Sequence, residues 1–175
     1  MSQSVIHIET PVMLRVRTLM LEELPLCLPF AQAFYTEMKL PGVFRSEVFL
    51  RTWSMFLSPP YTGEILSLWK DGELIGGLGV LLAPDQNDGR LAANEFFWYI
   101  DPAHRGGTGA LRLLKRFEQW AVERGAVECR LVHLLTGGEM ESPHSIKLAT
   151  LYRTLGYRPV EVAWLKPLTR SGEER

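Results

Sequence analysis

The chain has 175 residues, of which 46% are hydrophobic and 22% are charged, and its formal net charge is −1. This length and composition predict one soluble domain with a buried core, and the near-neutral charge argues against nucleic acid or an anionic membrane as partner. No apolar run approaches the ~20 residues that cross a bilayer, and the start lacks the pattern of a secretory signal. We therefore expect a cytoplasmic protein with an irregular leader over 1–12, a folded domain over 13–168 and a polar tail over 169–175.

The spacing of apolar residues predicts the elements in chain order. The predicted elements are a strand over 14–18, a helix over 22–38 whose regular body is 30–38, a helix over 45–57, strands over 64–69, 74–82 and 93–100, a helix over 111–124, a strand over 127–135, a helix over 145–155 and a strand over 157–165. This order predicts an α/β domain with a mixed sheet. The strand over 93–100 is apolar on both faces, so we expect it inside the sheet.

Glycines mark two features of the predicted strands. Asp71-Gly72 is a hairpin turn dipeptide between the strands at 64–69 and 74–82. Three more glycines are unusual because they lie inside a strand, and they indicate a bulge or the close approach of another group. They are Gly76, Gly77 and Gly79.

The segment 100–110 joins the strand at 93–100 to the helix at 111–124 and is the most informative part of the chain. Backbone N–H groups at a helix start have no partner within the helix, and the helix dipole adds positive potential, so such a turn is suited to a phosphate. Three glycines within four residues favour ligand binding over a turn without a ligand. The spacing required for a dinucleotide site or a P-loop is absent from the chain. The glycines are Gly106, Gly107 and Gly109.

Glu95 is unusual because it is a carboxylate within an apolar strand. Burial of a carboxylate is costly unless the group is paired or has a function. Strand alternation places Glu95 on the face shared by Phe97 and Tyr99. The alternatives are a glutamate paired with an arginine and one exposed at the strand end.

The cysteines and histidines give weaker signals. Cys27 and Cys129 lie in apolar segments, which predicts buried free thiols. His104 lies in the glycine-rich turn, where it is either solvated or in contact with an anion.

The segment from His133 to His144 contains Glu139 and Glu141 in no recognised metal-binding spacing, so we expect no metal site. The acidic loop 138–141 is either solvated or attracts a cationic amine.

Two blocks of sequence stand in order along the second half of the chain. The first is the window Arg105-Gly106-Gly107-Thr108-Gly109-Ala110, and the second is Leu151-Tyr152-Arg153-Thr154-Leu155-Gly156-Tyr157. Together they resemble the GNAT superfamily of acyl-CoA-dependent N-acyltransferases. That family's phosphate loop is Arg or Gln, two residues, Gly, one residue, then Gly or Ala. Three positions depart from the family pattern. Thr108 stands where the family has a glycine, Ser145 where it often has an asparagine and Leu148 where it often has an alanine.

The resemblance covers roughly residues 13–166 and implies the fold and the cofactor. It implies a single GNAT-like domain with a mixed, mostly antiparallel central sheet, splayed central strands and flanking helices. It implies acetyl-CoA as cosubstrate, with no metal. The residues expected to bind it are the strand residues Trp98, Tyr99 and Ile100, the loop residues Arg105, Gly106, Gly107, Thr108, Gly109 and Ala110, and Ser145.

The resemblance also implies catalytic roles. Glu95 is expected to act as general base, because an amine must lose a proton before it attacks, and Tyr152 as the general acid that protonates the departing thiolate. Tyr152 also lies on an apolar helical stripe, so a core tyrosine is the alternative. In the family the second helix borders the acceptor pocket. Trp53, Phe56 and Tyr61 fall near this helix, although such residues are more often core.

The leading hypothesis is transfer of an acetyl group from acetyl-CoA to a primary amine by direct attack in a ternary complex. The expected partner is an amine-bearing small molecule or a protein amine, and a homodimer is one further expectation because dimers are common in the family. Two other classes of function stay open, since fold does not fix function. They are a non-catalytic acyl-CoA-binding or protein-interaction module and a nucleotide-binding regulator.

Overall fold

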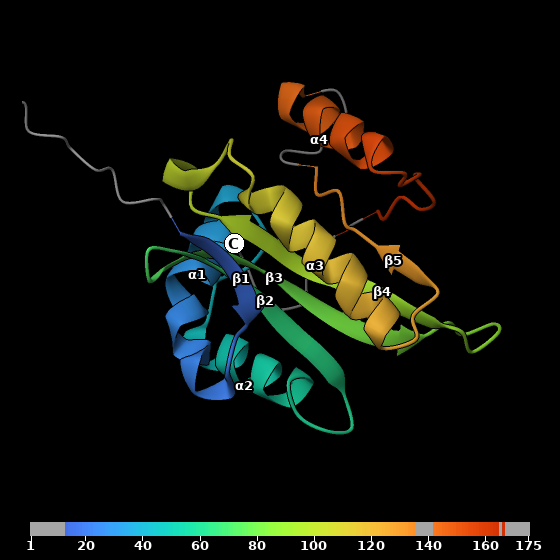
Figure 1. Ribbon diagram of the computed structural model, residues 1–175, viewed down its shortest axis with the longest axis horizontal. Helices are drawn as coiled ribbons and strands as arrows, with labels where there is room; N and C mark the ends of the chain where they lie inside the picture. Colours follow the sequence, from blue (N-terminus) through green and yellow to red (C-terminus); the bar gives the residue numbers. More distant parts are fainter. Residues whose placement is uncertain (1–12, 136–141, 165, 167–175) are drawn as a thin grey trace, which may run out of the picture. The chain divides into compact units, whose positions relative to one another are not determined.

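The computed structural model describes residues 13–135, 142–164 and 166. Its elements are β1 (Leu14–Thr18), the 3₁₀ helix η1 (Leu21–Cys27), α1 (Leu28–Glu37), α2 (Ser46–Phe56), β2 (Thr62–Lys70), β3 (Glu73–Pro84), β4 (Leu91–Ile100), the 3₁₀ helix η2 (Pro102–His104), α3 (Gly109–Glu123), β5 (Glu128–Arg130) and α4 (Pro143–Thr154) (Figure 1). They fall into two compact units, Met1–Gly137 and Gly138–Arg175, which we describe separately.

The sheet of the first unit has five strands in the order β1-β2-β3-β4-β5. The first four strands pair antiparallel and β5 pairs parallel to β4, so the predicted mixed, mostly antiparallel sheet is confirmed. The hairpin between β2 and β3 turns at Asp71 and Gly72, both with positive φ, as the dipeptide predicts. The parallel pairing of β4 and β5 requires the long connection that α3 supplies.

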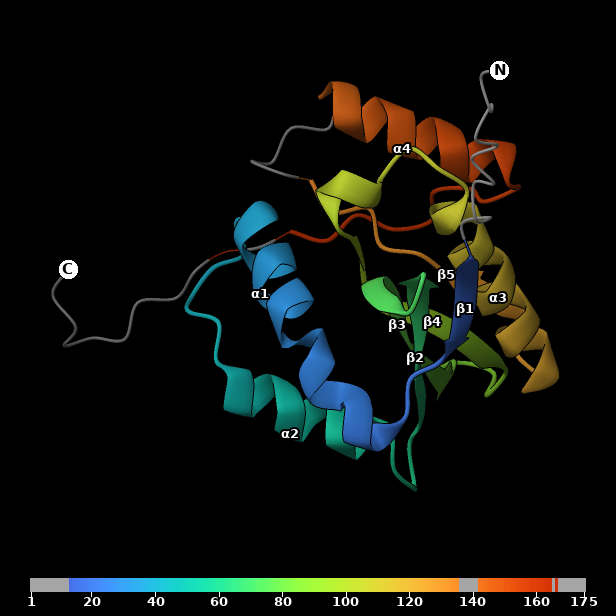
Figure 2. The same ribbon diagram turned by 60° about the vertical axis from the view of Figure 1, so that its left-hand side comes forward.

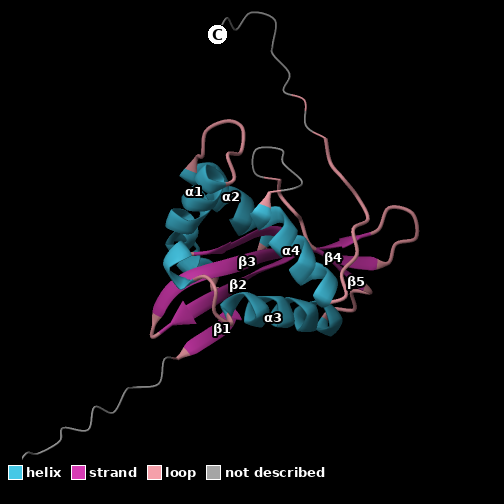
Figure 3. Ribbon diagram, turned by 90° about the horizontal axis from the view of Figure 1, so that it is seen from above, coloured by secondary structure: helices cyan, strands magenta, loops and turns pink. Residues whose placement is uncertain are grey.

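Helices cover both faces of this sheet. The strands lie between α1 and α2 on one side and α3 on the other (Figure 3). α3 is amphipathic and buries Leu113, Phe117 and Trp120 against one face of the sheet, which we call the α3 face. A second core lies on the opposite face, where Trp53 of α2 packs with residues from η1 and β2. The two-sided cover explains why β2 and β3 carry buried residues on both faces.

The glycines of β3 allow two close approaches. A Cβ atom on Gly76 would lie 2.5 Å from the carbonyl oxygen of Tyr99. A Cβ atom on Gly79 would lie 2.4 Å from the rings of both Phe97 and Trp53. The predicted close approach is therefore confirmed, and the groups that approach are strand β4 and helix α2.

Two predicted strands differ in the structure. β5 is three residues long, and residues 131–135 continue outside a strand, against the prediction of 127–135. Residues 157–164 are irregular, against the prediction of a strand over 157–165, whose last residue lies outside the described part. Apolar runs give both segments strand propensity, but a strand also needs a neighbour for its backbone hydrogen bonds. Neither segment pairs with a strand within the described residues.

The described part of the second unit is built around α4. Ser142 caps its start, where the Ser142 hydroxyl accepts a hydrogen bond from the backbone N–H of Ser145 (3.2 Å). The helix is followed by Gly156, whose φ of +88° is the left-handed conformation common after helix ends. The rings of Tyr152 and Tyr157 lie 6.0 Å apart. The second block of the sequence thus forms the last turns of α4 and the residues that follow them.

Candidate active site

Hydrogen bonds of its backbone and of Asp101 stabilise the turn that follows β4. The backbone N–H of Asp101 donates to the carbonyl of Ile75 (2.9 Å), which keeps the turn on the sheet. The Asp101 carboxylate accepts a hydrogen bond from the N–H of Ala103 (2.8 Å) and caps η2. The N–H of Arg105 donates to the carbonyl of Pro102 (3.3 Å). The glycine-rich segment therefore starts from a fixed point.

A row of free amides follows this point. Gly106 has a φ of +85°, a conformation that only glycine adopts without strain, and it turns the chain toward α3. Within the described residues, the N–H groups from Gly106 to Leu111 meet no hydrogen-bond acceptor. No described atom lies within 4 Å of where a Cβ on Gly106 or Gly107 would be. An open cradle of amides at the start of a 15-residue helix matches the requirements of a phosphate.

Thr108 and Gly109 have structural roles at the start of α3. The carbonyl of Thr108 accepts the N–H of Arg112 (3.0 Å), while the Thr108 hydroxyl makes no capping bond. A Cβ on Gly109 would lie 2.7 Å from the Leu68 side chain, so this glycine is explained by packing of α3 on β2. Its amide still belongs to the cradle.

The Arg105 side chain is bound to protein groups on several sides. Its Nε donates to the carbonyl of Ile100 (2.7 Å), and its two terminal nitrogens donate to the two carboxylate oxygens of Glu37 (2.7 Å each). The guanidinium also lies 5.1 Å from the centre of the Tyr99 ring. Any charge that Arg105 offers to a phosphate is therefore shared with Glu37.

Strand β4 loses its neighbour β5 before the loop begins. The β4–β5 ladder ends at the pair Asn94 and Arg130, whereas β4 continues to Ile100 along β3. The predicted splay of the central strands is the result. Trp98, Tyr99 and Ile100 lie along this part of β4, beyond the end of the ladder.

One extra residue in β4 reverses the predicted face of Glu95. Gly79 pairs with Phe97 and Val80 with Glu95, so Phe96 is an inserted residue. The rings of Phe96 and Phe97 both contact Trp53 of α2, at centroid distances of 6.4 and 5.2 Å. Alternation is broken there, and the prediction that Glu95 shares a face with Phe97 and Tyr99 is wrong.

The face of Glu95 follows from the residues before the insertion. Ala93 belongs to the core on the α3 face, and strand alternation places Glu95 on that same face. After the insertion, Trp98 and Ile100 return to this face. Glu95 therefore lies on the α3 side of the sheet, at the residue that follows the end of the β4–β5 ladder.

The Glu95 carboxylate is buried where β4 and β5 part. Glu95 is 7% exposed and accepts a hydrogen bond from the backbone N–H of Val132 (2.7 Å), just after β5. Burial raises the pKa of Glu95 to about 7, and the Val132 hydrogen bond opposes the rise. No described arginine or lysine pairs with it, so the alternatives of an arginine-paired or exposed glutamate are wrong for this part of the chain. A carboxyl group that titrates near neutrality suits proton transfer.

Tyr152 and Ser145 lie in α4 of the second unit, and both are buried. Glu95 and the glycine-rich loop lie in the first unit. The structure thus brings the carboxylate, the open part of β4 and the amide row into one unit. It places Tyr152 and Ser145 seven residues apart on one helix.

The aromatic residues expected near an acceptor pocket differ in burial. Trp53 is a core residue, as the alternative predicts. Phe56 is half-buried, and its ring contacts the half-exposed rings of Tyr61 (5.7 Å) and Phe96 (5.3 Å). We call Phe56, Tyr61 and Phe96 the aromatic surface cluster.

The two thiols are poor nucleophiles. Cys27 is buried and Cys129 is half-buried, and both are free. Burial raises the pKa of Cys27 to about 12 and that of Cys129 to about 11. Since the thiolate is the reactive form, neither residue is suited to form an acyl-enzyme near neutral pH.

The described residues offer neither a cluster of metal ligands nor a membrane-spanning helix. Across 13–135 and 142–164 no group of three or more His, Cys, Asp or Glu side chains could hold a metal ion. None of the helices in these segments has the length and apolarity to span a bilayer. The expectations for Glu139, Glu141, the loop 138–141 and the His144 side chain lie outside the described residues.

Comparisons with known proteins identify the family of this chain. Residues 27–157 match the family model described as the acetyltransferase (GNAT) family. The chain therefore belongs to the GNAT acetyltransferase family, and it is an acyl-CoA-dependent N-acyltransferase. Comparison with curated proteins finds no significant match.

Solved structures share the fold at low sequence identity. An aminoglycoside acetyltransferase from an uncultured soil metagenomic sample is 19% identical, with a TM-score of 0.68 over 90% of this chain and 99% of that chain. AAC(6')-Iy in complex with the bisubstrate analogue CoA-S-monomethyl-acetylneamine is 16% identical, with a TM-score of 0.68 over 90% of this chain and 99% of that chain. A transcriptional regulator from Bacillus halodurans C-125 is 15% identical, with a TM-score of 0.69 over 89% of this chain and 100% of that chain.

Sequence reasoning missed two residues of the site, Glu37 and Val132. They lie 68 and 37 positions from their partners Arg105 and Glu95. Val132 acts through its backbone, so no side-chain pattern could reveal it. Glu37 gives a signal, because a carboxylate at the end of a predicted helix opposes the helix dipole.

Proposed function

We propose that this protein transfers an acetyl group from acetyl-CoA to a primary amine, which attacks the thioester directly in a ternary complex. The observation that carries the proposal is Glu95, a buried carboxyl group with a pKa of about 7 at the point where β4 and β5 part. The raised pKa values of both cysteines support direct attack over an acyl-enzyme.

The amide cradle and the open part of β4 are the proposed binding site for the cosubstrate. The N–H groups from Gly106 to Ala110 would hold the pyrophosphate, and the α3 dipole would add to their potential. The backbone of Trp98, Tyr99 and Ile100 would pair with the amides of the pantetheine arm, because β5 has left this part of β4. Ser145 is a further proposed contact.

The proposed roles of Glu95 and Tyr152 follow the protons. Glu95 accepts the proton of the ammonium group, whose nitrogen then attacks the thioester carbon. Backbone amides near Ile100 would stabilise the charge that develops on the carbonyl oxygen. As the carbon–sulfur bond breaks, the Tyr152 hydroxyl donates its proton to the sulfur, and the second proton that the nitrogen loses as the amide forms returns to the tyrosine through solvent. Because the pKa of Glu95 is about 7, its carboxylate can accept the proton and later release it to solvent.

The acceptor is proposed as a class. The fold neighbours include aminoglycoside acetyltransferases, which supports an amine-bearing small molecule, and a protein amine is the other proposed acceptor. The aromatic surface cluster is proposed to line the acceptor side, because its partly exposed rings gather at the end of α2, the helix that borders the acceptor pocket in the family. The cytoplasmic location and the homodimer remain predictions.

The test combines binding with turnover on the full-length protein. Calorimetry with CoA and acetyl-CoA measures binding, and release of free thiol with a panel of primary amines measures transfer. The proposal expects binding of both compounds and thiol release with at least one amine. Binding without thiol release across the panel would favour a non-catalytic acyl-CoA-binding module, and binding of ATP or NAD in place of CoA would favour a nucleotide-binding regulator.

A further inference from the structure

The ion pair between Glu37 and Arg105 joins helix α1 to the amide cradle. Glu37 is the last residue of α1, and Arg105 is the residue before Gly106. The end of α1 lies beside the turn after β4 (Figure 2). Both carboxylate oxygens take part at 2.7 Å, the two-point geometry that makes arginine–carboxylate pairs strong and directional.

Two further contacts of Arg105, and the packing of one of its partners on α1, make its position specific. Its Nε is bound to the carbonyl of Ile100, and its guanidinium lies over the Tyr99 ring. That ring contacts Phe30 and Phe34 of α1 at centroid distances of 6.1 and 6.5 Å. Arg105 is thereby held by the end of β4 and by two positions along α1.

The location of Glu37 is unfavourable for the helix itself. The end of a helix carries partial negative charge, so a carboxylate there is destabilising, and the last turn of α1 contains no basic residue. The Arg105 guanidinium offsets this cost from outside the helix. A residue that conflicts with its own helix indicates a role elsewhere in the fold.

The cradle depends on this contact because few others hold it. Upstream, Arg105 is the last residue of the turn with a backbone hydrogen bond. Downstream, the first fixed residue is Thr108, through its bond to Arg112 in α3. The segment between them meets no described partner, so its conformation is set by its two ends.

We propose that Glu37 is a positioning residue for the cosubstrate. It holds Arg105 so that the amides from Gly106 onward point at one place, where the pyrophosphate binds. The inference rests on the proposed function, and it assigns Arg105 a role in shaping the cradle beyond direct contact with phosphate.

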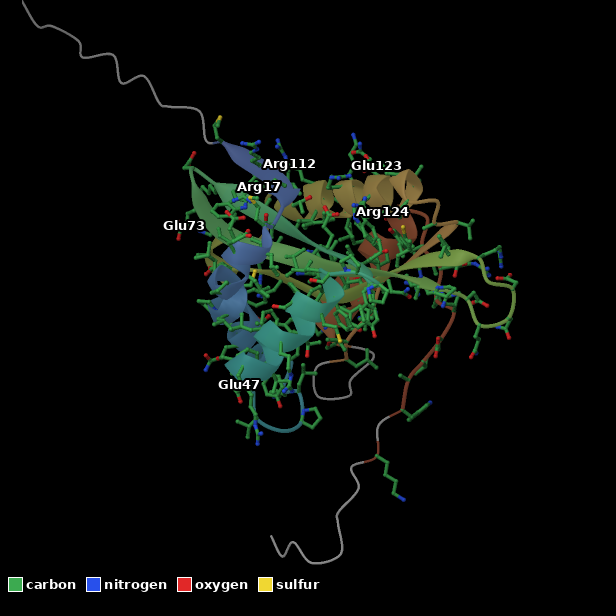
Figure 4. All side chains as sticks on the ribbon, turned by 90° about the horizontal axis from the view of Figure 1, so that it is seen from below. Arg17, Glu47, Glu73, Arg112, Glu123 and Arg124 are labelled. Atoms are coloured by element: carbon green, nitrogen blue, oxygen red, sulfur yellow. The ribbon has the colours of Figure 1, made fainter. Side chains whose placement is uncertain are left out.

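The test compares Glu37→Ala with Glu123→Ala in the full-length protein. Glu123 is a matched control because it is also the last residue of its helix and also pairs with an arginine, Arg116 (3.1 Å). It lies at the end of α3 away from the cradle, whereas Arg112 lies near the start (Figure 4). Calorimetry gives the Kd for CoA, thiol release gives kcat and KM, and thermal unfolding gives Tm.

We expect Glu37→Ala to raise the Kd for CoA and the KM for acetyl-CoA about tenfold while kcat stays within about twofold, the pattern of lost binding that is equal in ground and transition states. Glu123→Ala should leave the Kd, KM and kcat unchanged. Arg105→Lys should weaken CoA binding similarly, and its effect should not add to that of Glu37→Ala, because both changes break one contact. Glu37→Gln, which keeps one acceptor oxygen, should recover part of the affinity.

Four results would overturn the inference. Tighter CoA binding by Glu37→Ala would show that Glu37 competes with phosphate for Arg105. A fall in Tm and kcat with unchanged KM would show a role in stability alone. If the parent protein binds no CoA, the proposed function fails and this inference fails with it, whereas a parent that binds CoA and a Glu37→Ala variant of equal affinity would overturn the inference alone.

Discussion

Glu64 and Glu95 are the buried glutamates of the described sheet, and their surroundings differ. Glu64 in β2 is 5% exposed and accepts hydrogen bonds from Trp120 Nε1 (2.6 Å), from Arg124 (2.8 Å) and from the hydroxyl of Thr18. Among the described residues, Glu95 in β4 accepts one hydrogen bond, from the backbone N–H of Val132. The first carboxylate is compensated by charge and by several donors, whereas the second is not.

The difference follows from the neighbours of each strand. Glu64 lies two residues beyond the end of the β1–β2 ladder, and its donors come from Thr18, from Trp120 of α3 and from Arg124 directly after α3. β4 loses β5 at the residue before Glu95, so Glu95 keeps a ladder partner only in β3, and no cation pairs with it within the described residues. Several donors and a cation stabilise the Glu64 carboxylate, so its role is structural. Glu95 lacks such partners among the described residues and exchanges its proton near neutral pH.

Replacement of Glu95 by Gln should have the largest effect. Loss of a general base typically lowers the rate by about 10²- to 10⁴-fold, so we expect kcat to fall at least about a hundredfold, with the affinity for CoA unchanged. In the parent, kcat/KM should rise with pH through about 7, as Glu95 loses its proton, and this rise should be absent in Glu95→Gln. A variant that keeps its rate and its pH profile would contradict the assignment of the base.

The same substitution should stabilise the fold at alkaline pH. The pKa of Glu95 is raised in the folded state, from its ordinary 4.5 to about 7, so the unfolded chain loses the proton first. Stability therefore falls as pH rises between these values, by an amount on the order of 3 kcal/mol. Gln does not titrate, so the gain of Glu95→Gln over the parent should grow between about pH 4.5 and about pH 8. Urea denaturation at both pH values measures it, and a constant difference would contradict the raised pKa.

Replacement of Glu64 by Gln should have the opposite outcome. Trp120 and Arg124 donate to one oxygen of Glu64 and the Thr18 hydroxyl donates to the other, so Gln can keep these contacts only as weaker, uncharged hydrogen bonds and leaves Arg124 without its ion pair. The loss should lower the free energy of unfolding by about 2 kcal/mol. Urea denaturation should show this loss, while kcat at room temperature should stay within about twofold of the parent. A large fall in kcat for the folded variant would show that Glu64 also acts in the chemistry.

Removal of the Tyr152 hydroxyl should have the smallest effect of the four. A thiol with a pKa near 8.5 leaves reasonably well as the thiolate, so loss of its proton donor should lower kcat of Tyr152→Phe only about tenfold. Thiol release measured from pH 6 to pH 9 should show a deficit that shrinks as pH rises, because the thiolate then needs no donor. An unchanged kcat at every pH would assign Tyr152 to packing alone.

Local sequence patterns predicted most of the secondary-structure elements of this protein. The hairpin at Asp71-Gly72, the helices and the glycine-rich turn before α3 all follow from residues within a few positions of one another. The candidate cofactor loop was found because a strand, a run of glycines and a helix are adjacent in the chain. Glu95 was found because a charge within an apolar strand is costly wherever the strand packs.

Tertiary structure decided the geometry of the site. The inserted Phe96 moved Glu95 to the α3 face, because one extra residue changes the side on which every earlier side chain lies. The end of the β4–β5 ladder left the Glu95 carboxylate with a backbone N–H for a partner. The pair Glu37 and Arg105 formed across 68 positions. The spacing of apolar residues shows which positions of a helix or strand are buried. Strand register, the separation of β4 and β5 and contacts between residues far apart in the sequence depend on how whole elements pack. That information is spread over the entire chain.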